Sequence, residues 1–247
     1  MTARLGRWVP AVLLLAVACS AGPDKTTKQG RTFQDLWQPF LVIAGLVVLL
    51  IWGLVAWCVI RYRARPGDDG LPNQDGDKPR LELAYTLVPL LLVAVLFTAS
   101  VIGERDISRL DDDPDLVVDV GGFRWDWQFT YVGAGIRVTG EPGERPVLRL
   151  PVGRTVRFRL HADDVIHSFW VPEFGTKRDL IPGLDNEIDI DIVEAGTWTG
   201  RCAEYCGLDH ATMDFEVQAM PADEFDAWLD EAAADDGADP AVREVTG

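Results

Sequence analysis

Two long apolar runs constrain this chain more than any other feature of its sequence. The first extends from Pro39 to Ile60 and the second from Leu83 to Ile102, and neither contains a charged residue. An apolar helix of about 20 residues matches the hydrocarbon thickness of a bilayer. Pro89 is compatible with a membrane helix, because neighbouring groups can satisfy the freed carbonyl. We therefore predict a transmembrane helical hairpin over residues 32–103, with helices at about 39–60 and 83–102.

Basic residues in the connection between these helices predict the orientation of the hairpin. The connection, residues 61–82, contains Arg61, Arg63, Arg65, Lys78 and Arg80. Short loops that carry an excess of Lys and Arg stay on the cytoplasmic side. We therefore expect a two-helix protein of the cell (inner or plasma) membrane, with a cytoplasmic connection. The N-terminus and everything after residue 103 would then be extracytoplasmic.

Residues 1–22 have the pattern of a signal segment. Arg4 and Arg7 precede an apolar stretch that ends at Cys19. The Ala16–Cys19 segment resembles the cleavage box of bacterial lipoproteins, which predicts that Cys19 becomes a lipidated N-terminus. The alternative is a signal in which Cys19 has no role. Cys58, near the end of the first helix, is expected to be buried and inert.

Residues 115–231 have the pattern of an all-β domain. Val117–Thr130 alternates and is rich in Val, Phe and Trp, as a half-buried strand is. Short strands separated by Gly and Pro predict a β-sandwich. A short helix is expected over Pro221–Ala232, and a disordered tail over residues 232–247. The further strands are expected at Ile136–Val138, Val147–Leu150, Thr155–Leu160, Glu187–Ile192 and Phe215–Ala219.

The acidity of the chain is concentrated after the second apolar run. Residues 103–247 contain 32 Asp and Glu and 13 Lys and Arg, a net charge of −19, against −16 for the whole chain. Such a field would attract a basic partner and repel nucleic acid. Solubility, or adaptation to a salty or acidic habitat, explains the same charge equally well.

The densest cluster of metal-binding side chains lies between Cys202 and Met213. Cys206 and His210 fall between them, and His167 precedes the cluster. Thiolate, imidazole and thioether donors together favour copper over ions that prefer oxygen. A single electron-transfer copper needs only one Cys, so the second Cys points to two coppers bridged by thiolates. The ligand count then gives two bridging Cys, two terminal His and one axial Met.

One further weak donor is expected from the backbone between the two cysteines, where Glu204 is the natural candidate. Three alternatives stay open: a Cys202–Cys206 disulfide, a structural zinc site built from the same Cys and His residues, and Met213 as core filler. His161, the remaining His, is expected to be a structural or surface residue.

Aromatic residues alternate from Phe123 to Phe129. A period of two would place Phe123, Trp125, Trp127 and Phe129 on one face of a strand. We expect Trp127 and Phe129 in the core. An exposed indole near the metal would offer electrons a path to it, and the pattern leaves open which Trp is exposed.

Taken together, these motifs resemble subunit II of haem–copper cytochrome c oxidases, which carries the binuclear copper centre called CuA. The resemblance covers about Thr32 to Leu229 and implies a two-helix transmembrane hairpin followed by an all-β cupredoxin-like sandwich. It is carried by Arg124–Trp127, His167–Pro172, Asp179–Gly183 and Cys202–Met213. It implies that cytochrome c reduces CuA, which passes electrons to a haem of subunit I for oxygen reduction coupled to proton pumping.

The resemblance also implies roles for single residues. Glu204 matches the residue whose carbonyl binds copper and whose side chain reaches a magnesium ion shared with subunit I. Trp125 matches the point of electron entry from cytochrome c. Glu82 resembles a glutamate near the mouth of a proton channel, although the helix dipole also favours Glu at a helix start. The copper side-chain ligands match His167, Cys202, Cys206, His210 and Met213.

Two departures concern the docking of cytochrome c. Asp126 stands where the family often has an aromatic residue, and the segment after Tyr131 lacks acidic docking residues. Asp163 and Asp164 are alternative contacts for a basic partner, or simply a solvated loop.

Rival functions are a membrane lipoprotein that stores or delivers copper, and the CuA domain of a nitrous oxide reductase, which needs a large catalytic domain. A quinol oxidase subunit II would lack the copper ligands. The predicted helices contain no His to bind haem, so oxygen chemistry would belong to another subunit of a proton-translocating cytochrome c oxidase.

Overall fold

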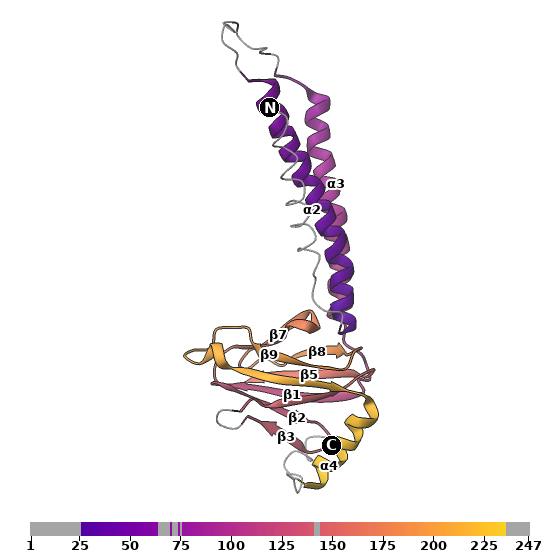
Figure 1. Ribbon diagram of the computed structural model, residues 1–247, viewed down its shortest axis with the longest axis vertical. Helices are drawn as coiled ribbons and strands as arrows, with labels where there is room; N and C mark the ends of the chain where they lie inside the picture. Colours follow the sequence, from indigo (N-terminus) through magenta and orange to yellow (C-terminus); the bar gives the residue numbers. More distant parts are fainter. Residues whose placement is uncertain (1–25, 64–69, 71–73, 75, 141–143, 236–247) are drawn as a thin grey trace, which may run out of the picture. The chain divides into compact units, whose positions relative to one another are not determined.

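A computed structural model describes residues 26–63, 70, 74, 76–140 and 144–235 of this chain (Figure 1). These residues form two compact units. One comprises residues 35–104, and the other joins the segment up to Gln34 with the chain from Arg105 onward. The predicted signal segment and the lipidation site at Cys19 lie outside the described residues.

The first unit consists of two long helices that lie side by side (Figure 1). Helix α2 spans Lys28–Arg61 and α3 spans Pro79–Ile107. Both are long and apolar enough to cross a membrane. Each extends beyond its predicted range, because polar turns continue the helix past the apolar run. Cys58 is exposed on α2 in this single chain, so its predicted burial is wrong.

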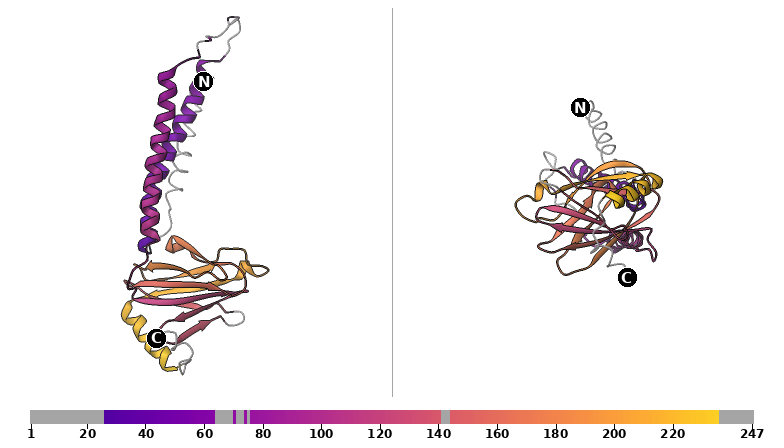
Figure 2. Two further views of the ribbon diagram at one scale, coloured as in Figure 1. Left: turned by 180° about the vertical axis from the view of Figure 1, so that it is seen from behind. Right: turned by 90° about the horizontal axis from the view of Figure 1, so that it is seen from below.

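The second unit is a sandwich of two five-stranded sheets, as predicted (Figure 2). The sheets have the strand orders β3-β2-β1-β5-β8 and β4-β10-β9-β6-β7. The first sheet contains β1 (Leu116–Phe123), β2 (Asp126–Tyr131), β3 (Ile136–Thr139), β5 (Thr155–Ala162) and β8 (Asn186–Asp191). The second contains β4 (Val147–Pro151), β6 (His167–Val171), β7 (Thr176–Leu180), β9 (Gly196–Cys202) and β10 (Asp214–Met220). The predicted class, two apolar helices followed by an all-β sandwich, is confirmed.

The prediction of one strand over Val117–Thr130 is wrong, because the chain turns back at Arg124 and Trp125. β1 and β2 form an antiparallel hairpin in which Phe123 pairs with Asp126. Acidic side chains stabilise the turn, since Asp164 accepts a hydrogen bond from the Arg124 amide at 2.9 Å. The four aromatic residues therefore do not share one face: Phe123 is 36% exposed, whereas the core prediction for Trp127 and Phe129 is confirmed.

An aromatic cluster fills the space between the sheets. The ring of Phe215 lies 5.2 Å from Trp127, 5.3 Å from Phe129 and 5.1 Å from Phe169. Gly200 lies opposite Phe215 on β9, where a Cβ atom would overlap the Phe215 ring. These contacts hold β6, β9 and β10 together at the end of the sheet that carries the predicted metal ligands.

Helix α4 (Ala222–Asp235) follows the last strand and packs against β3 and β4 (Figure 2). Trp228 covers Tyr131 at a ring distance of 5.2 Å. The helix continues beyond the predicted end at Ala232, so the first four residues of the predicted disordered tail are helical. Residues 236–247 lie outside the described part of the chain.

The start of α2 is attached to the sandwich, an association that the sequence pattern does not reveal. Thr27 caps the helix by accepting a hydrogen bond from the Gly30 amide at 2.9 Å. It also forms a β-bridge with Ile192, and its hydroxyl donates to the Phe174 carbonyl at 2.7 Å. Gln29 hydrogen-bonds the β8 backbone through its side chain. Residues more than 140 positions apart in sequence are thus joined.

A buried ion pair fixes the segment that follows α3. The Asp189 side chain, 3% exposed, accepts hydrogen bonds from Arg157 at 2.8 and 2.9 Å. It also accepts a bond from the Asp111 amide at 2.6 Å. Removing one member of a buried pair leaves the other charge without compensation.

We predict that Asp189→Asn lowers the free energy of unfolding by about 3 kcal/mol, because Arg157, whose side chain is only 16% exposed, loses its counter-charge. Denaturant titration of the full chain in detergent, followed by Trp fluorescence, measures this. Glu194→Gln is the control, since it breaks the exposed Arg31–Glu194 pair at 3.7 Å and should cost no more than about 0.5 kcal/mol. Equal losses of stability in the two variants would contradict the conclusion that the Arg157–Asp189 pair contributes more than an exposed pair.

Candidate metal centre

Strand pairing brings the distant ligand residues to one end of the second sheet. His167 is the first residue of β6 and Cys202 the last of β9, and the pairing of Phe169 with Cys202 sets these strand ends side by side. Cys206 lies in the loop that follows. His210 opens the short 3₁₀ helix η3 (His210–Thr212), and Met213 comes directly after it.

The donor atoms of these residues form a continuous chain of short contacts. The Sγ atoms of Cys202 and Cys206 are 3.8 Å apart. His167 Nδ1 lies 3.8 Å from Cys202 Sγ. On the other side, His210 Nδ1 and Met213 Sδ lie 3.6 and 3.7 Å from Cys206 Sγ. All five predicted side chains are thus brought together.

The backbone carbonyl of Glu204 also faces the site, 3.2 Å from Cys202 Sγ. Its side chain is exposed, and so is available to a group outside this chain. The Tyr205 ring lies edge-on to His210 at 5.7 Å and is 76% exposed. The predicted backbone donor therefore sits where the ligand count requires it.

Asp164 orients His167, a role that the sequence pattern did not suggest. His167 is fully buried, and its Nε2 lies 3.0 Å from Asp164 Oδ1. Burial opposes ionisation of Asp164, but hydrogen bonds from His167, the Val165 amide and Arg124 hold the pKa of this carboxyl well below its usual range. A carboxylate behind a metal-binding His fixes the ring and its tautomer. The feature of the sequence that could have indicated this role is the position of Asp164, three residues before His167.

The two thiols ionise differently in the metal-free protein. Burial opposes ionisation of Cys202, but hydrogen bonding to His167 and neighbouring groups lowers its pKa to about 6. Burial and the nearby Cys202 thiolate raise the pKa of Cys206 to about 12. Burial also acts to lower the pKa of His167, and hydrogen bonds to Cys202 and Asp164 outweigh it and raise the pKa. Two thiolates side by side in this buried site repel each other, so a bound cation would favour ionisation of both.

The donor set fits a soft metal. The donors of His167, Cys202 and Cys206 lie within 4.8 Å of one another, and all three residues are buried. A metal–thiolate bond is roughly 2.3 Å long, so two sulfurs 3.8 Å apart can bind the same ion. Cys202 and Cys206 are free thiols, and two His and a thioether complete a donor set that favours copper.

Both tryptophans of the β1–β2 hairpin are hydrogen-bonded to ligand residues. Trp125 Nε1 donates to the Cys206 carbonyl at 3.2 Å, and Trp127 Nε1 donates to the Met213 carbonyl at 3.2 Å. Trp127 is buried and Trp125 is partly exposed. Gly207, at φ 125°, permits the close approach of the Trp125 ring, because a Cβ atom there would lie 3.1 Å from the indole. No local sequence pattern marks Gly207 for this role, because the indole that contacts it lies more than eighty residues earlier in the chain.

Three other predicted residues lie away from this cluster. His161 is exposed on β5, near Gly121. Glu82 is exposed in the first turn of α3, in the other unit. Asp163 is exposed, whereas its neighbour Asp164 is engaged with His167 and Arg124.

Comparison with known proteins gives one consistent family. The sequence-family model described as cytochrome c oxidase subunit II, periplasmic domain, matches residues 143–220 of this chain. Cytochrome c oxidase subunit 2 of Alkalihalophilus pseudofirmus is 34% identical over 217 residues, which cover 86% of this chain and 62% of that protein. This chain thus spans less than two thirds of that relative's length. A probable cytochrome c oxidase subunit 2 of Streptomyces coelicolor is 33% identical, with 85% and 78% covered.

Among solved structures, the periplasmic domain of subunit II of cytochrome oxidase from Bradyrhizobium japonicum is similar to this chain. It is 30% identical, with 51% of this chain and 98% of that chain covered and a TM-score of 0.46.

We predict that Asp164→Asn weakens metal binding about 10- to 100-fold, because His167 loses the carboxylate that orients it. Competition with a copper chelator measures the affinity. Asp163→Asn is the matched control, since it removes the same charge from the adjacent exposed position and should leave the affinity within about twofold. Equal losses in the two variants would show that only loop charge matters.

Proposed function

Because this chain belongs to the cytochrome c oxidase subunit 2 family, we propose that it is the electron-entry subunit of a haem–copper oxidase. In this proposal a cytochrome c delivers electrons to a binuclear copper centre, CuA, and a haem of subunit I receives them. Oxygen reduction and proton pumping take place in subunit I. The observation that carries the proposal is the chain of five side-chain donors and one carbonyl, joined by contacts of 3.2 to 3.8 Å.

The pair of thiols distinguishes this site from a single-copper site. Cys202 and Cys206 offer two bridging sulfurs, and each has its own terminal imidazole. The axial donors differ, since Met213 lies by Cys206 and the Glu204 carbonyl lies by Cys202. Two bridged coppers, when bound, would share one electron and so spread the change in geometry on reduction. Asp164 holds His167 in one orientation during this exchange.

Trp125 is the proposed electron entry. Its partly exposed indole is linked by one hydrogen bond to the backbone of Cys206. A partner that contacts this ring would therefore be separated from the Cys206 sulfur only by the indole, one hydrogen bond and the covalent bonds within Cys206. The acidic charge of residues 103–247 would attract a basic cytochrome c, and Asp163 is an exposed candidate contact.

Further roles follow from the same family. The exposed Glu204 side chain is proposed to bind magnesium together with subunit I. Glu82, in the first turn of α3, is proposed to lie near the mouth of a proton channel. The helices would anchor the chain in the cell membrane with the sandwich on the extracytoplasmic side, as the basic residues after α2 suggest.

The proposal predicts the electron paramagnetic resonance spectrum of the full chain loaded with copper in detergent. Two coppers per chain with one shared electron give a seven-line hyperfine pattern, and Cys202→Ser should abolish it. A four-line pattern from a single localised copper would refute the binuclear site. A colourless protein that holds zinc would favour the metal-handling lipoprotein.

We further predict that Trp125→Phe slows reduction by cytochrome c on the order of tenfold or more, equivalent to about 1.4 kcal/mol in activation free energy. The indole hydrogen bond to Cys206 is lost, whereas copper content should not change. Stopped-flow absorbance in the oxidase complex measures the rate. Trp170→Phe is the control, because Trp170 is also partly exposed but stacks with Arg201 on β9. Unchanged rates in both variants would exclude entry through Trp125.

A further inference from the structure

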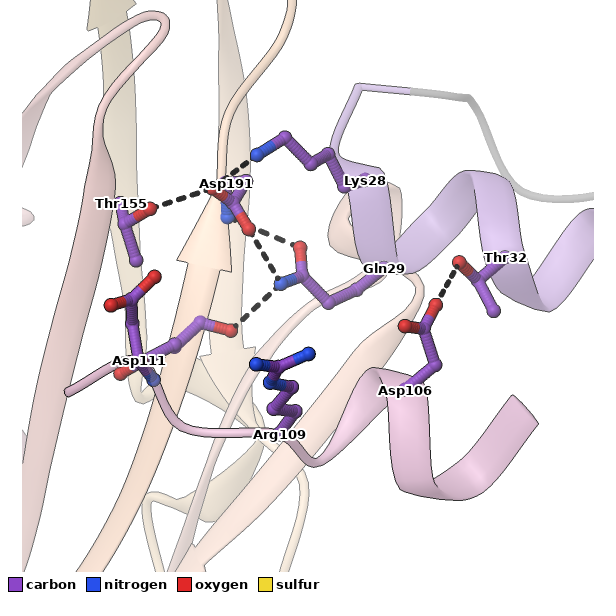
Figure 3. A pocket seen from close by; sticks show the side chains of 9 residues that line it. Lys28, Gln29, Thr32, Asp106, Arg109, Asp111, Thr155 and Asp191 are labelled. Carbon is purple, nitrogen blue, oxygen red and sulfur yellow. Dashed lines mark hydrogen bonds and ion pairs between the residues drawn. The ribbon is translucent and has the colours of Figure 1, made fainter. Parts of the chain in front are cut away.

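A polar cavity of about 320 Å³ lies where α2 begins and α3 ends (Figure 3). It is wholly within the unit that contains the sandwich, since its lining comes from residues before Gln34 and after Arg105. The metal ligands do not line it. The residues that matter for its chemistry are Lys28, Gln29, Thr32, Asp106, Arg109 and Asp111.

One wall of the cavity is a fixed hydrogen-bond network. Asp191 accepts bonds from Lys28 Nζ at 2.8 Å, from Thr155 Oγ1 at 2.8 Å and from Gln29 Nε2 at 3.2 Å. On the other side, the Thr32 hydroxyl donates to Asp106 at 3.0 Å. Side chains locked in this way form a preorganised site, because little rotamer entropy remains to be lost on binding.

Two charged side chains of the cavity, Arg109 and Asp106, form no ion pair among the residues described. The Arg109 side chain projects into the cavity in Figure 3 and makes no ion pair there. Asp106 forms no ion pair among the described residues and accepts only the Thr32 hydroxyl. Asp111 also lines the cavity; its carboxylate accepts the Asp113 amide at 3.1 Å and lies in the field of Arg157. The cavity thus offers one guanidinium and two carboxylates, so a ligand that carries both signs of charge satisfies it best.

The cavity also lies next to the segments that enter the membrane. Thr32 is on α2 shortly before the apolar run, and Asp106 is in the last turn of α3. Phe33 and Trp37 follow on α2 and are 36% and 39% exposed. Exposed aromatic residues at the end of a membrane helix mark the level of the lipid headgroups.

We propose that this cavity binds the phosphoethanolamine headgroup of a membrane phospholipid. Arg109 holds the phosphate, with Lys28 at the rim, because a guanidinium pairs well with phosphate oxygens. Asp106 and Asp111 accept hydrogen bonds from the ammonium group. A glycerol headgroup offers the two carboxylates no cation, and a lone cation leaves Arg109 without an anion.

The test uses the full chain, purified in detergent and stripped of lipid. Phosphatidylethanolamine and phosphatidylglycerol with identical acyl chains are titrated, and native mass spectrometry counts bound lipid. We expect phosphatidylethanolamine to bind about tenfold more tightly, the size of one charge-assisted hydrogen bond. Arg109→Gln should weaken the binding of both lipids about tenfold, because both carry the phosphate that Arg109 is proposed to hold. Arg105→Gln should leave both affinities unchanged, because Arg105 is exposed in the last turn of α3 and does not line the cavity.

Two further measurements keep the proposal open to refutation. The double variant Asp106→Asn with Asp111→Asn should lose the preference for phosphatidylethanolamine over phosphatidylglycerol. Retention of copper by this variant would show that it is still folded. Free phosphoethanolamine should compete with the lipid, and inorganic phosphate should not. Equal binding of both lipids, equal effects of the two Arg substitutions, or competition by inorganic phosphate alone would overturn the assignment.

Discussion

The metal centre depends on one carboxylate that links two parts of the sandwich. Asp164 accepts bonds from the Arg124 amide in the β1–β2 turn and contacts His167 Nε2 on β6. The same turn carries Trp125, whose indole is bonded to the Cys206 carbonyl. His167, the proposed electron-entry side chain Trp125 and the cysteine loop are therefore held in one frame. Their positions stay fixed because His167 Nε2 and the indole N–H of Trp125 each have a hydrogen-bond partner.

Electrostatics explains why such a site must be built for a cation. The pKa of Cys202 falls and that of Cys206 rises, since both thiols cannot ionise side by side in a buried place. A bound metal cation would neutralise the repulsion between the two sulfurs and favour ionisation of both thiols. Metal binding then releases the remaining proton. The rigid sandwich supplies the spacing, and the cation supplies the charge balance.

The attachment of α2 to the sandwich and the cavity beside it form a separate polar system. Thr27, Gln29 and Lys28 bond to β8 and to the turn before β7. The buried Arg157–Asp189 pair fixes the segment after α3 from the other side. Both chain segments that lead to the membrane are thereby tied to the domain that carries the metal ligands. A lipid headgroup at this place would extend the same network.

The sequence by itself determined the two apolar helices, the all-β domain and the six candidate donors that the structure brings together, because hydropathy, strand alternation and ligand chemistry are local properties. It misplaced the end of the first strand, since the turn at Arg124 depends on Asp164, forty residues away. Neither the docking of residues 26–30 on the sandwich nor the pairing of Asp164 with His167 was predicted. These features come from contacts between distant segments, which only the packed sheets bring within hydrogen-bonding distance.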